Sequence, residues 1–299
     1  MTIDARTDDP VQTMLDVIEL ERMEARTHED IFLGRSHFMP SGRVFGGQVL
    51  SQVVSAAART IADDRHVHSL HGYFLRPGDM RKDITFGVDR IHDGRSFARR
   101  RVQGYQDGVP IFSGILSFQD EDEGVEHQLP MPEVPAPEDL PDPLRELDRH
   151  PHSQRLLAAN PIEVRHVEGS LLVEPTGGAR PTQAVWTRVR RPIGDSRLLH
   201  QAALAYLSDY TIQEPSMRGA GVAWSTTGLK VASLDHAMWW HRPARADEWL
   251  LYVQESPGAQ GGRGLAFGRL YTRDGALVAS VAQEIMLRVP TSDAVSPPA

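Results

Sequence analysis

The stretch VFGGQVLSQVVSAAARTIA, residues 44–62, repeats its apolar side chains with the period of an α-helix. The apolar set consists of Val49, Leu50, Val53, Val54, Ala57 and Ile61. Its members lie one, three or four residues apart, which gathers them on one face of a helix. The stretch therefore predicts a helix that buries this face and exposes the other.

Strand-like runs follow the predicted helix. Residues 68–79, HSLHGYFLRPGD, and residues 83–119 are rich in β-branched and aromatic side chains, which are typical of strands. Asp-Gly pairs at 93–94 and 107–108 favour hairpin turns between these runs. This part of the chain predicts one helix followed by an antiparallel meander.

The same order returns in the second part of the chain. Residues 197–212, RLLHQAALAYLSDYTI, are helical in pattern and precede the runs ASLDHAMWWHRP, EWLLYVQES, GLAFGRLYTRDG and ALVASVAQEIMLRV. Arg76-Pro77 aligns with Arg242-Pro243 at an offset of 242 − 76 = 166. Asp107-Gly108 aligns with Asp274-Gly275 at an offset of 274 − 107 = 167. This internal repeat predicts two copies of one α+β unit, in which each sheet wraps its helix.

Composition breaks once between the two copies. Residues 120–143, DEDEGVEHQLPMPEVPAPEDLPDP, are acidic and proline-rich and have almost no periodic apolar positions, so they bury too little surface to fold alone. We expect an N-terminal domain over 12–119, a linker over 120–160, a C-terminal domain over 161–290 and a disordered tail over 291–299.

The overall composition excludes several classes of function. The 299 residues carry a formal net charge of −8, which disfavours nucleic acid as a partner because phosphate binding needs a Lys/Arg excess. Cysteine is absent, so disulfides, thiol nucleophiles and Cys-ligated metals are excluded. The N-terminus lacks the pattern of a signal peptide, and no apolar run reaches about 18 residues. We expect a cytoplasmic protein without a membrane span.

Several long motifs occur in the same order as in a known family. They are RVFGGQVLSQ at 43–52, VHSLHGYFLRPGD at 67–79, DGRSFARRRV at 93–102, SLDHAMWWHRP at 233–243, EWLLY at 248–252 and DGALVASVAQE at 274–284. The sequence resembles the acyl-CoA thioesterase II family, whose chains are two fused hot-dog domains. The resemblance implies a double hot-dog fold of the α+β class, hydrolysis of a fatty acyl-CoA substrate to free acid and coenzyme A, and no cofactor.

The repeat also nominates a site. Where the first copy holds aliphatic or methyl side chains, the second copy holds polar groups at three equivalent positions. With Gln48 aligned on Gln201 and the offsets above, the contrasts are Asp209 against Ala56, Ser233 against Val67, and Gln283 against Leu116. The resemblance independently implies the same three positions, because family members use an Asp, a Thr or Ser, and a Gln to activate a water. We expect the second copy to carry the chemistry.

These residue types suit thioester hydrolysis by water. Asp209 would act as general base, and shielding from solvent would raise its pKa towards the value that proton abstraction at neutral pH requires. Ser233 and Gln283 would hold the water and stabilise the oxyanion through hydrogen bonds. Each residue also has an ordinary interpretation: a solvated aspartate ending a helix, a strand serine, and a surface glutamine.

Other candidate motifs give weaker predictions. His236 and His241 lie five residues apart, on opposite faces of a strand, so we interpret them as core or surface residues and expect no metal site. The sequence GDSRL at 194–198 precedes a helix, where Asp195 or Ser196 serves as an N-cap. The arginines of RSFARRR at 95–101 are either solvated or ligands of the coenzyme A phosphates.

Two alternatives to a thioesterase stay open. A hot-dog enoyl-CoA hydratase would use an Asp/His pair, and the segment YLSDYTIQEP has no histidine after its aspartate. A non-catalytic acyl-CoA binding or sensor protein could use the same fold, since fold alone does not fix function. By resemblance we also expect a homodimer or homotetramer.

Overall fold

The computed structural model describes residues 9–24, 27–62, 64–146, 157–176 and 178–290. The N-terminal half contains α1 (Pro10–Ile18), β1 (Glu21–Met23), β2 (Asp30–Gly34), α2 (Gly46–Ala58), β3 (His66–Phe74), β4 (Ile84–Asp93), β5 (Phe97–Gln106) and β6 (Val109–Gln119). The connecting segment contains η1 (Pro137–Asp139) and α3 (Pro143–Glu146). The C-terminal half contains β7 (Ile162–His166), β8 (Thr182–Val189), α5 (Arg197–Ser208), α6 (Glu214–Gly219), β9 (Lys230–Ser233), β10 (Asp235–Trp240), β11 (Leu250–Gln260), β12 (Arg263–Thr272) and β13 (Leu277–Arg288).

The two expected central helices are confirmed as α2 and α5. The expected exposed face of α2 is wrong, because every residue from Gly47 to Ala57 is buried. Helix α5 begins where the side chain of Ser196 accepts a hydrogen bond from the backbone of Leu199 at 3.4 Å, so the GDSRL motif is an N-cap. The hairpin between β5 and β6 turns at Asp107 and Gly108, whose φ angles are 50° and 75°. Positive φ at both central residues is the reason that an Asp-Gly pair favours this turn.

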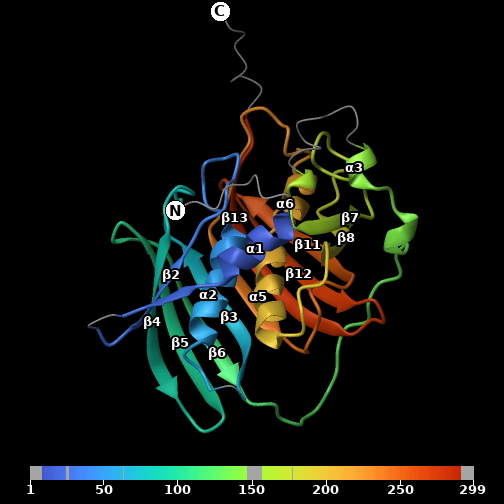
Figure 1. The fold of residues 1–299 in the computed structure, drawn as a ribbon. Coiled ribbons are helices and arrows are strands. Elements are labelled where there is room, and N and C mark those ends of the chain that lie inside the picture. Colours follow the sequence, from blue (N-terminus) through green and yellow to red (C-terminus); the bar gives the residue numbers. More distant parts are fainter. Residues whose placement is uncertain (1–8, 25–26, 63, 147–156, 177, 291–299) are drawn as a thin grey trace, which may run out of the picture.

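One continuous antiparallel sheet joins the two halves. Its strand order is β1-β2-β4-β5-β6-β3-β10-β13-β12-β11-β8-β7, with β9 pairing on β13. The order of strands in the first half is repeated in reverse beyond the junction of β3 and β10, as expected for two copies of one unit related by a two-fold axis. Figure 1 shows α2 and α5 side by side on one face of this sheet.

The centre of the junction identifies the axis between the copies. His71 of β3 pairs with Ala237 of β10, and the repeat offset also relates these residues, since 237 − 71 = 166. A residue that pairs with its own repeat equivalent lies on the axis. The pseudo-two-fold axis therefore passes between His71 and Ala237, and one hydrophobic core with residues from both halves lies beneath it.

Close packing of the two helices requires a glycine. A Cβ atom added at Gly47 would lie 2.3 Å from the carbonyl oxygen of Tyr206 on α5, far inside van der Waals contact. The N-terminal end of α2 therefore lies directly against the C-terminal half, close to the end of α5.

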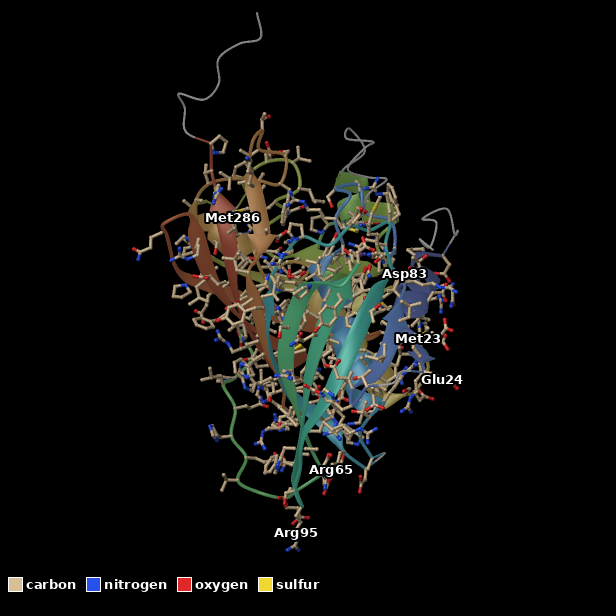
Figure 2. All side chains as sticks on the ribbon, turned by 90° about the vertical axis from the view of Figure 1, so that its left-hand side faces the viewer. Met23, Glu24, Arg65, Asp83, Arg95 and Met286 are labelled. Atoms are coloured by element: carbon tan, nitrogen blue, oxygen red, sulfur yellow. The ribbon has the colours of Figure 1, made fainter. Side chains whose placement is uncertain are left out.

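The acidic segment packs on the C-terminal half. The segment begins at Asp120, which accepts a hydrogen bond from Arg65 at 2.7 Å. From there it runs around the C-terminal half (Figure 1). Figure 2 shows Arg65 and Arg95 at the lower end of the molecule, where the segment begins. Trp186 donates to the carbonyl oxygen of Pro135 at 2.8 Å. Met131 and Val134 pack on a cluster formed by Trp186 and its neighbours, on the sheet face opposite α5. Residues 147–156 and the expected tail, 291–299, lie outside the described residues.

Candidate active site

Asp209 lies at the C-terminal end of α5, where it is the C-cap residue. It is 2% exposed, so the alternative of a solvated aspartate ending the helix is wrong. Its Oδ1 atom accepts hydrogen bonds from Ser233 Oγ at 3.0 Å and from Gln283 Nε2 at 2.8 Å. The structure therefore brings the three predicted residues together, although 74 residues separate the outer two.

Two strands deliver the partners of Asp209. Ser233 is the last residue of β9 and pairs with Ile285 of β13, while Gln283 lies two residues earlier on β13. Gln283 is fully buried, so the surface interpretation of this residue is wrong. Its Nε2 atom also donates to Ser233 Oγ at 2.9 Å. The hydroxyl and the amide thus contact each other as well as the carboxylate.

A register break supports the alignment of Ser233 with Val67. Val67 pairs with Phe118 before the ladder between β3 and β6 shifts by one residue. Ser233 pairs with Ile285 before a corresponding shift between β13 and β10. Both strands therefore break register at the equivalent place, and the hydroxyl of Ser233 occupies the position of an aliphatic side chain in the first half.

Burial dominates the electrostatics of this carboxyl group. Removal from solvent raises the pKa of Asp209 to about 6, and hydrogen bonds from Gln283, Ser233 and the backbone of Gly47 offset part of that rise. Burial penalises the charged form, whereas each donated hydrogen bond favours it. A carboxylate with this pKa is ionised at neutral pH and is a stronger proton acceptor than a solvated one.

The first half contributes the N-terminus of α2 to the site. A Cβ atom added at Gly46 would lie 2.6 Å from Asp209 Oδ2 and 3.1 Å from the ring of Phe74. The first helical N–H groups and the positive end of the helix dipole therefore face the buried carboxylate. This contribution is not predicted by the repeat. The Gly-Gly pair at the start of the predicted helix was the available signal.

Two sequence patterns of one protein family match the chain. The sequence pattern of the acyl-CoA thioesterase N-terminal domain matches residues 35–119, and that of the acyl-CoA thioesterase C-terminal domain matches residues 132–287. The chain belongs to the acyl-CoA thioesterase family. This result confirms the resemblance and the identification of the chain as an acyl-CoA thioesterase. The C-terminal match begins within the acidic segment, at the part that packs on the second half.

Three proteins resemble the chain along most of its length. Acyl-coenzyme A thioesterase 8 from Homo sapiens is 39% identical over 287 residues, covering 91% of this chain and 88% of that protein. The crystal structure of the acyl-CoA thioesterase II TesB2 from Mycobacterium marinum matches with a TM-score of 0.73 at 41% identity, covering 94% and 98% of the two chains. A hot-dog protein of unknown function from Alicyclobacillus acidocaldarius matches with a TM-score of 0.73 at 20% identity, covering 93% and 99%. The double hot-dog fold is confirmed.

In this acyl-CoA thioesterase a second glutamine donates to the carboxylate of Asp209. Gln213 lies in the turn between α5 and α6, and its Nε2 atom donates to Asp209 Oδ1 at 3.2 Å and to Ser233 Oγ at 3.3 Å. It therefore contacts the same two oxygen atoms as Gln283, at longer distances. Gln213 is not predicted from the sequence, because it lies beyond the helical pattern and outside every aligned motif.

The two histidines of the SLDHAMWWHRP motif differ sharply. His236 is 1% exposed and contacts Gln283 Oε1 through Nδ1 and Ser208 Oγ through Nε2, the latter at 3.1 Å. His241 is exposed and its Nε2 atom lies 2.9 Å from Ser280 Oγ. One is thus a core residue and the other a surface residue. Within the described ranges, no three His, Asp or Glu side chains are grouped to hold a metal ion.

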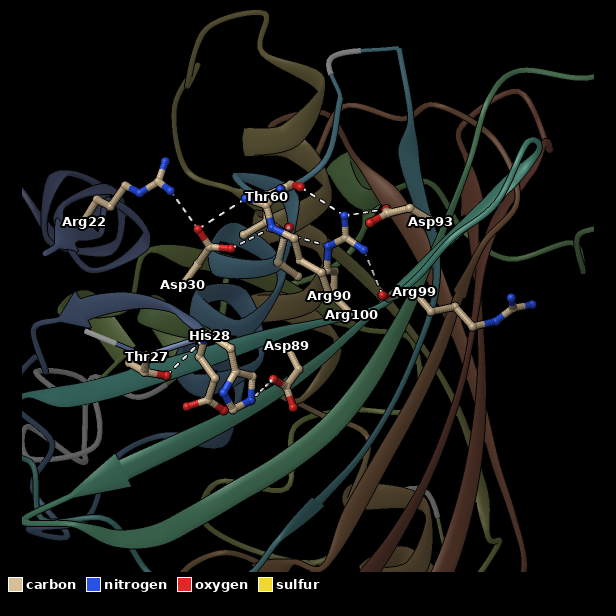
Figure 3. A network of polar contacts seen from close by, with 12 residues as sticks. Arg22, Thr27, His28, Asp30, Thr60, Asp89, Arg90, Asp93, Arg99 and Arg100 are labelled. Atoms are coloured by element: carbon tan, nitrogen blue, oxygen red, sulfur yellow. Dashed lines mark hydrogen bonds and ion pairs between the residues drawn. The ribbon is translucent and has the colours of Figure 1, made fainter. Parts of the chain in front are cut away.

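The arginine motif of β5 is partly structural. Arg100 is 2% exposed and donates to Thr60 Oγ1 at 2.8 Å and to Asp93 Oδ1 at 2.7 Å (Figure 3). It also donates to the carbonyl oxygen of Thr60 at 3.1 Å, just after the end of α2. Arg100 therefore fits neither the solvated interpretation nor the phosphate-binding one.

Proposed function

We propose that the chain hydrolyses the thioester of fatty acyl-CoA, releasing the free acid and coenzyme A, with a water activated by Asp209, Ser233 and Gln283. The observation that carries the proposal is the buried carboxylate with its raised pKa, in contact with one hydroxyl and one amide. The curated relative from Homo sapiens carries the name acyl-coenzyme A thioesterase, which supports the same reaction class.

The proposed reaction needs no covalent acyl-enzyme. Asp209 accepts a proton from the water while the water oxygen bonds to the thioester carbon, which gives a tetrahedral oxyanion. The carbon–sulfur bond then breaks, and the departing thiolate takes up the proton from Asp209. Ser233 and Gln283 orient the water, and the N-terminus of α2 supplies positive potential near the site for the oxyanion.

Measurement of free-thiol release tests this proposal. We expect the wild type to release coenzyme A from a panel of acyl-CoA substrates, and Asp209→Asn to lose about 1,000-fold in kcat, since a general base contributes roughly 10²- to 10⁴-fold. Asp235→Asn is the matched control, because burial also raises the pKa of Asp235 while that residue is bonded to the backbone of Glu284. Binding without turnover by the wild type would favour the alternative of an acyl-CoA sensor. Full turnover by Asp209→Asn would remove Asp209 from the role of base.

The hydratase alternative has less support from the geometry. Gln283 lies between His236 and Asp209 and contacts both, so the histidine and the carboxylate are linked through an amide rather than acting on one substrate atom. We expect no hydration of an enoyl-CoA, measured as the loss of its ultraviolet absorbance.

Two further expectations stay proposals. We expect a cytoplasmic location and a homodimer or homotetramer, and light scattering of the purified protein would test the oligomeric state. None of the helices in the described part of the chain is long and apolar enough to cross a bilayer.

A further inference from the structure

His236 is a buried titratable group to which the proposed mechanism assigns no step. It lies on β10 with 1% of its surface exposed. Its two ring nitrogens contact groups on different elements, namely Gln283 of β13 and Ser208 at the end of α5. Gln283 in turn contacts Asp209 and Ser233. A chain of polar contacts thus runs from α5 through the histidine to the atoms that hold the water.

The carboxylate determines which way the amide of Gln283 is turned. An ionised carboxylate has only acceptors, so the NH₂ group must be the end that lies 2.8 Å from Asp209 Oδ1. The amide oxygen Oε1 then faces His236 Nδ1. Because that oxygen can only accept, Nδ1 must carry a proton. The tautomer of the histidine and the orientation of the glutamine therefore depend on each other.

The neutral ring satisfies the remaining contact. Burial lowers the pKa of His236 to about 4, so at neutral pH the ring has a single N–H group, on Nδ1. Nε2 is then an acceptor, and Ser208 Oγ lies 3.1 Å away to donate to it. The same hydroxyl lies 2.9 Å from the carbonyl oxygen of Ala205, so its proton has two acceptors within reach.

The first half shows what these positions hold when no water has to be oriented. The repeat offsets align His236 with Leu70 and Gln283 with Leu116, since 236 − 70 = 166 and 283 − 116 = 167. Leu70 and Leu116 are direct cross-strand partners and both are buried. The second half thus replaces an apolar cross-strand pair by a histidine and a glutamine, which a purely structural core does not require.

We propose that His236 is a positioning residue for the hydrolytic water, whose Nδ1–H group holds the amide oxygen of Gln283 so that the NH₂ group stays turned towards Asp209 and Ser233. This inference rests on the proposed function. Gln213 donates to the same two oxygen atoms at 3.2 Å and 3.3 Å. Loss of His236 therefore weakens the water site, but the amide of Gln213 still donates to both oxygen atoms.

Two substitutions at position 236 test the role by thiol release. His236→Leu introduces the residue of the first half and removes the donor. His236→Asn keeps an N–H group near the place of Nδ1. We expect His236→Leu to lower kcat by about 10- to 100-fold, as for other residues that orient a catalytic ligand, with KM changed less than about twofold. His236→Asn should stay within about fivefold of the wild type in kcat.

The pH profile separates positioning from a general loss of structure. A carboxylate that loses an amide donor has a higher pKa, so the acidic limb of kcat/KM should move to higher pH in His236→Leu. His241→Leu, which removes the exposed histidine nearby, should change neither kcat nor the profile. Equal activity of His236→Leu and His236→Asn, or an effect on KM alone, would overturn the positioning role.

A measurement without substrate distinguishes this inference from the proposed function. The ¹⁵N shifts of the His236 ring in the wild type at neutral pH should show a protonated Nδ1 and an unprotonated Nε2. The opposite tautomer would overturn the inference whatever the activity. If the wild type shows the expected tautomer but releases no thiol from any acyl-CoA, the proposed function fails, and the orientation of Gln283 serves another purpose.

Discussion

The two halves of the molecule share one architecture but differ at the positions where the second carries polar groups. Ala56, Val67 and Leu116 of the first half are each at most 3% exposed, and they occupy the positions of Asp209, Ser233 and Gln283. Buried apolar groups stabilise a core, whereas a buried carboxyl group lowers its stability unless hydrogen bonds compensate. The comparison teaches that one copy keeps an apolar core at these positions while the other accepts the cost of a buried carboxyl group.

The candidate site is not confined to the second half, because the first half also supplies part of it. The N-terminus of α2 faces Asp209, and Gly46 and Gly47 permit the approach. In the same way α5 reaches the first half near its own N-terminal end, where Gln201 donates to the carbonyl oxygen of Val67 at 3.0 Å. Each helix end thus meets residues of the other copy, and the polar group around Asp209 lies where the N-terminal end of α2 meets the second copy.

The largest expected difference between the two halves is that Asp209 lowers the free energy of unfolding in a pH-dependent way. The pKa of Asp209 is raised from 3.8 to about 6 in the folded protein, so the folded state binds the proton more tightly than the unfolded state. The free energy of unfolding then falls as pH rises from about 4 to about 6, by about 3 kcal/mol at 1.36 kcal/mol per pKa unit. Asp209→Asn removes this dependence, so above pH 6 it should be more stable than the wild type.

Urea unfolding at pH 4, 5, 6 and 7 measures this difference. The free energy of unfolding of Asp209→Asn, relative to that of the wild type, should rise from pH 4 to pH 6 and then level off. A constant difference between the two proteins at all four pH values would show that burial does not penalise the ionised carboxyl group.

The next largest effect concerns the helix end that crosses from the first half. Gly46→Ala places a methyl group 2.6 Å from Asp209 Oδ2, which displaces the carboxylate, so we expect kcat to fall about 100-fold. Gly258→Ala is the matched control, because no atom lies within 4 Å of a Cβ at that position. Thiol release and thermal melting of both variants provide the measurement. Unchanged kcat in Gly46→Ala would show that α2 does not constrain the acidic group.

A smaller effect is expected when the site is converted towards the sequence of the first half. Ser233→Val installs the residue found at position 67 and removes a hydroxyl that donates to Asp209 and accepts from Gln283. We expect kcat to fall about tenfold, since Gln283 and Gln213 still contact the carboxylate. Ser233→Thr retains the hydroxyl and should stay near the wild type. Equal losses in the two variants would point to a steric rather than a hydrogen-bonding role.

The smallest effect is expected from the reverse exchange. Val67→Ser puts a hydroxyl into a position that is 3% exposed, and it removes two methyl groups from the core. We expect a loss of about 1–2 kcal/mol in the free energy of unfolding with kcat within twofold of the wild type. A large loss of kcat without a loss of stability would contradict the assignment of the chemistry to the second half.

Much of the fold could be predicted from the sequence, because its repeat is visible in short-range patterns. Helical periodicity located α2 and α5, and Asp107-Gly108 located a turn, since each depends on neighbouring residues only. The packing of the acidic segment could not be predicted. Its composition is that of an unfolded linker, and its order depends on a distant cluster around Trp186.

Site residues could be predicted where the two aligned halves differ in residue type. They could not be predicted where a contact joins one half to the other. Asp209 is charged whereas Ala56 is apolar, so alignment of the two halves identifies Asp209 as a candidate. Gly46 lies in the other half, and its Gly-Gly pair signals a close approach of the backbone without indicating which distant residue approaches it. The contact of His236 with Gln283 depends on the register of β10 against β13, which spacing along the chain does not fix.

The pseudo-two-fold axis between His71 and Ala237 has a genetic consequence. In a symmetric dimer of identical chains, one codon determines both residues that the symmetry relates, so every mutation alters two sites at once. Here the covalent connection gives positions 56 and 209 separate codons. A mutation at position 56 therefore leaves the carboxyl group at position 209 unchanged, and selection can act on each position alone.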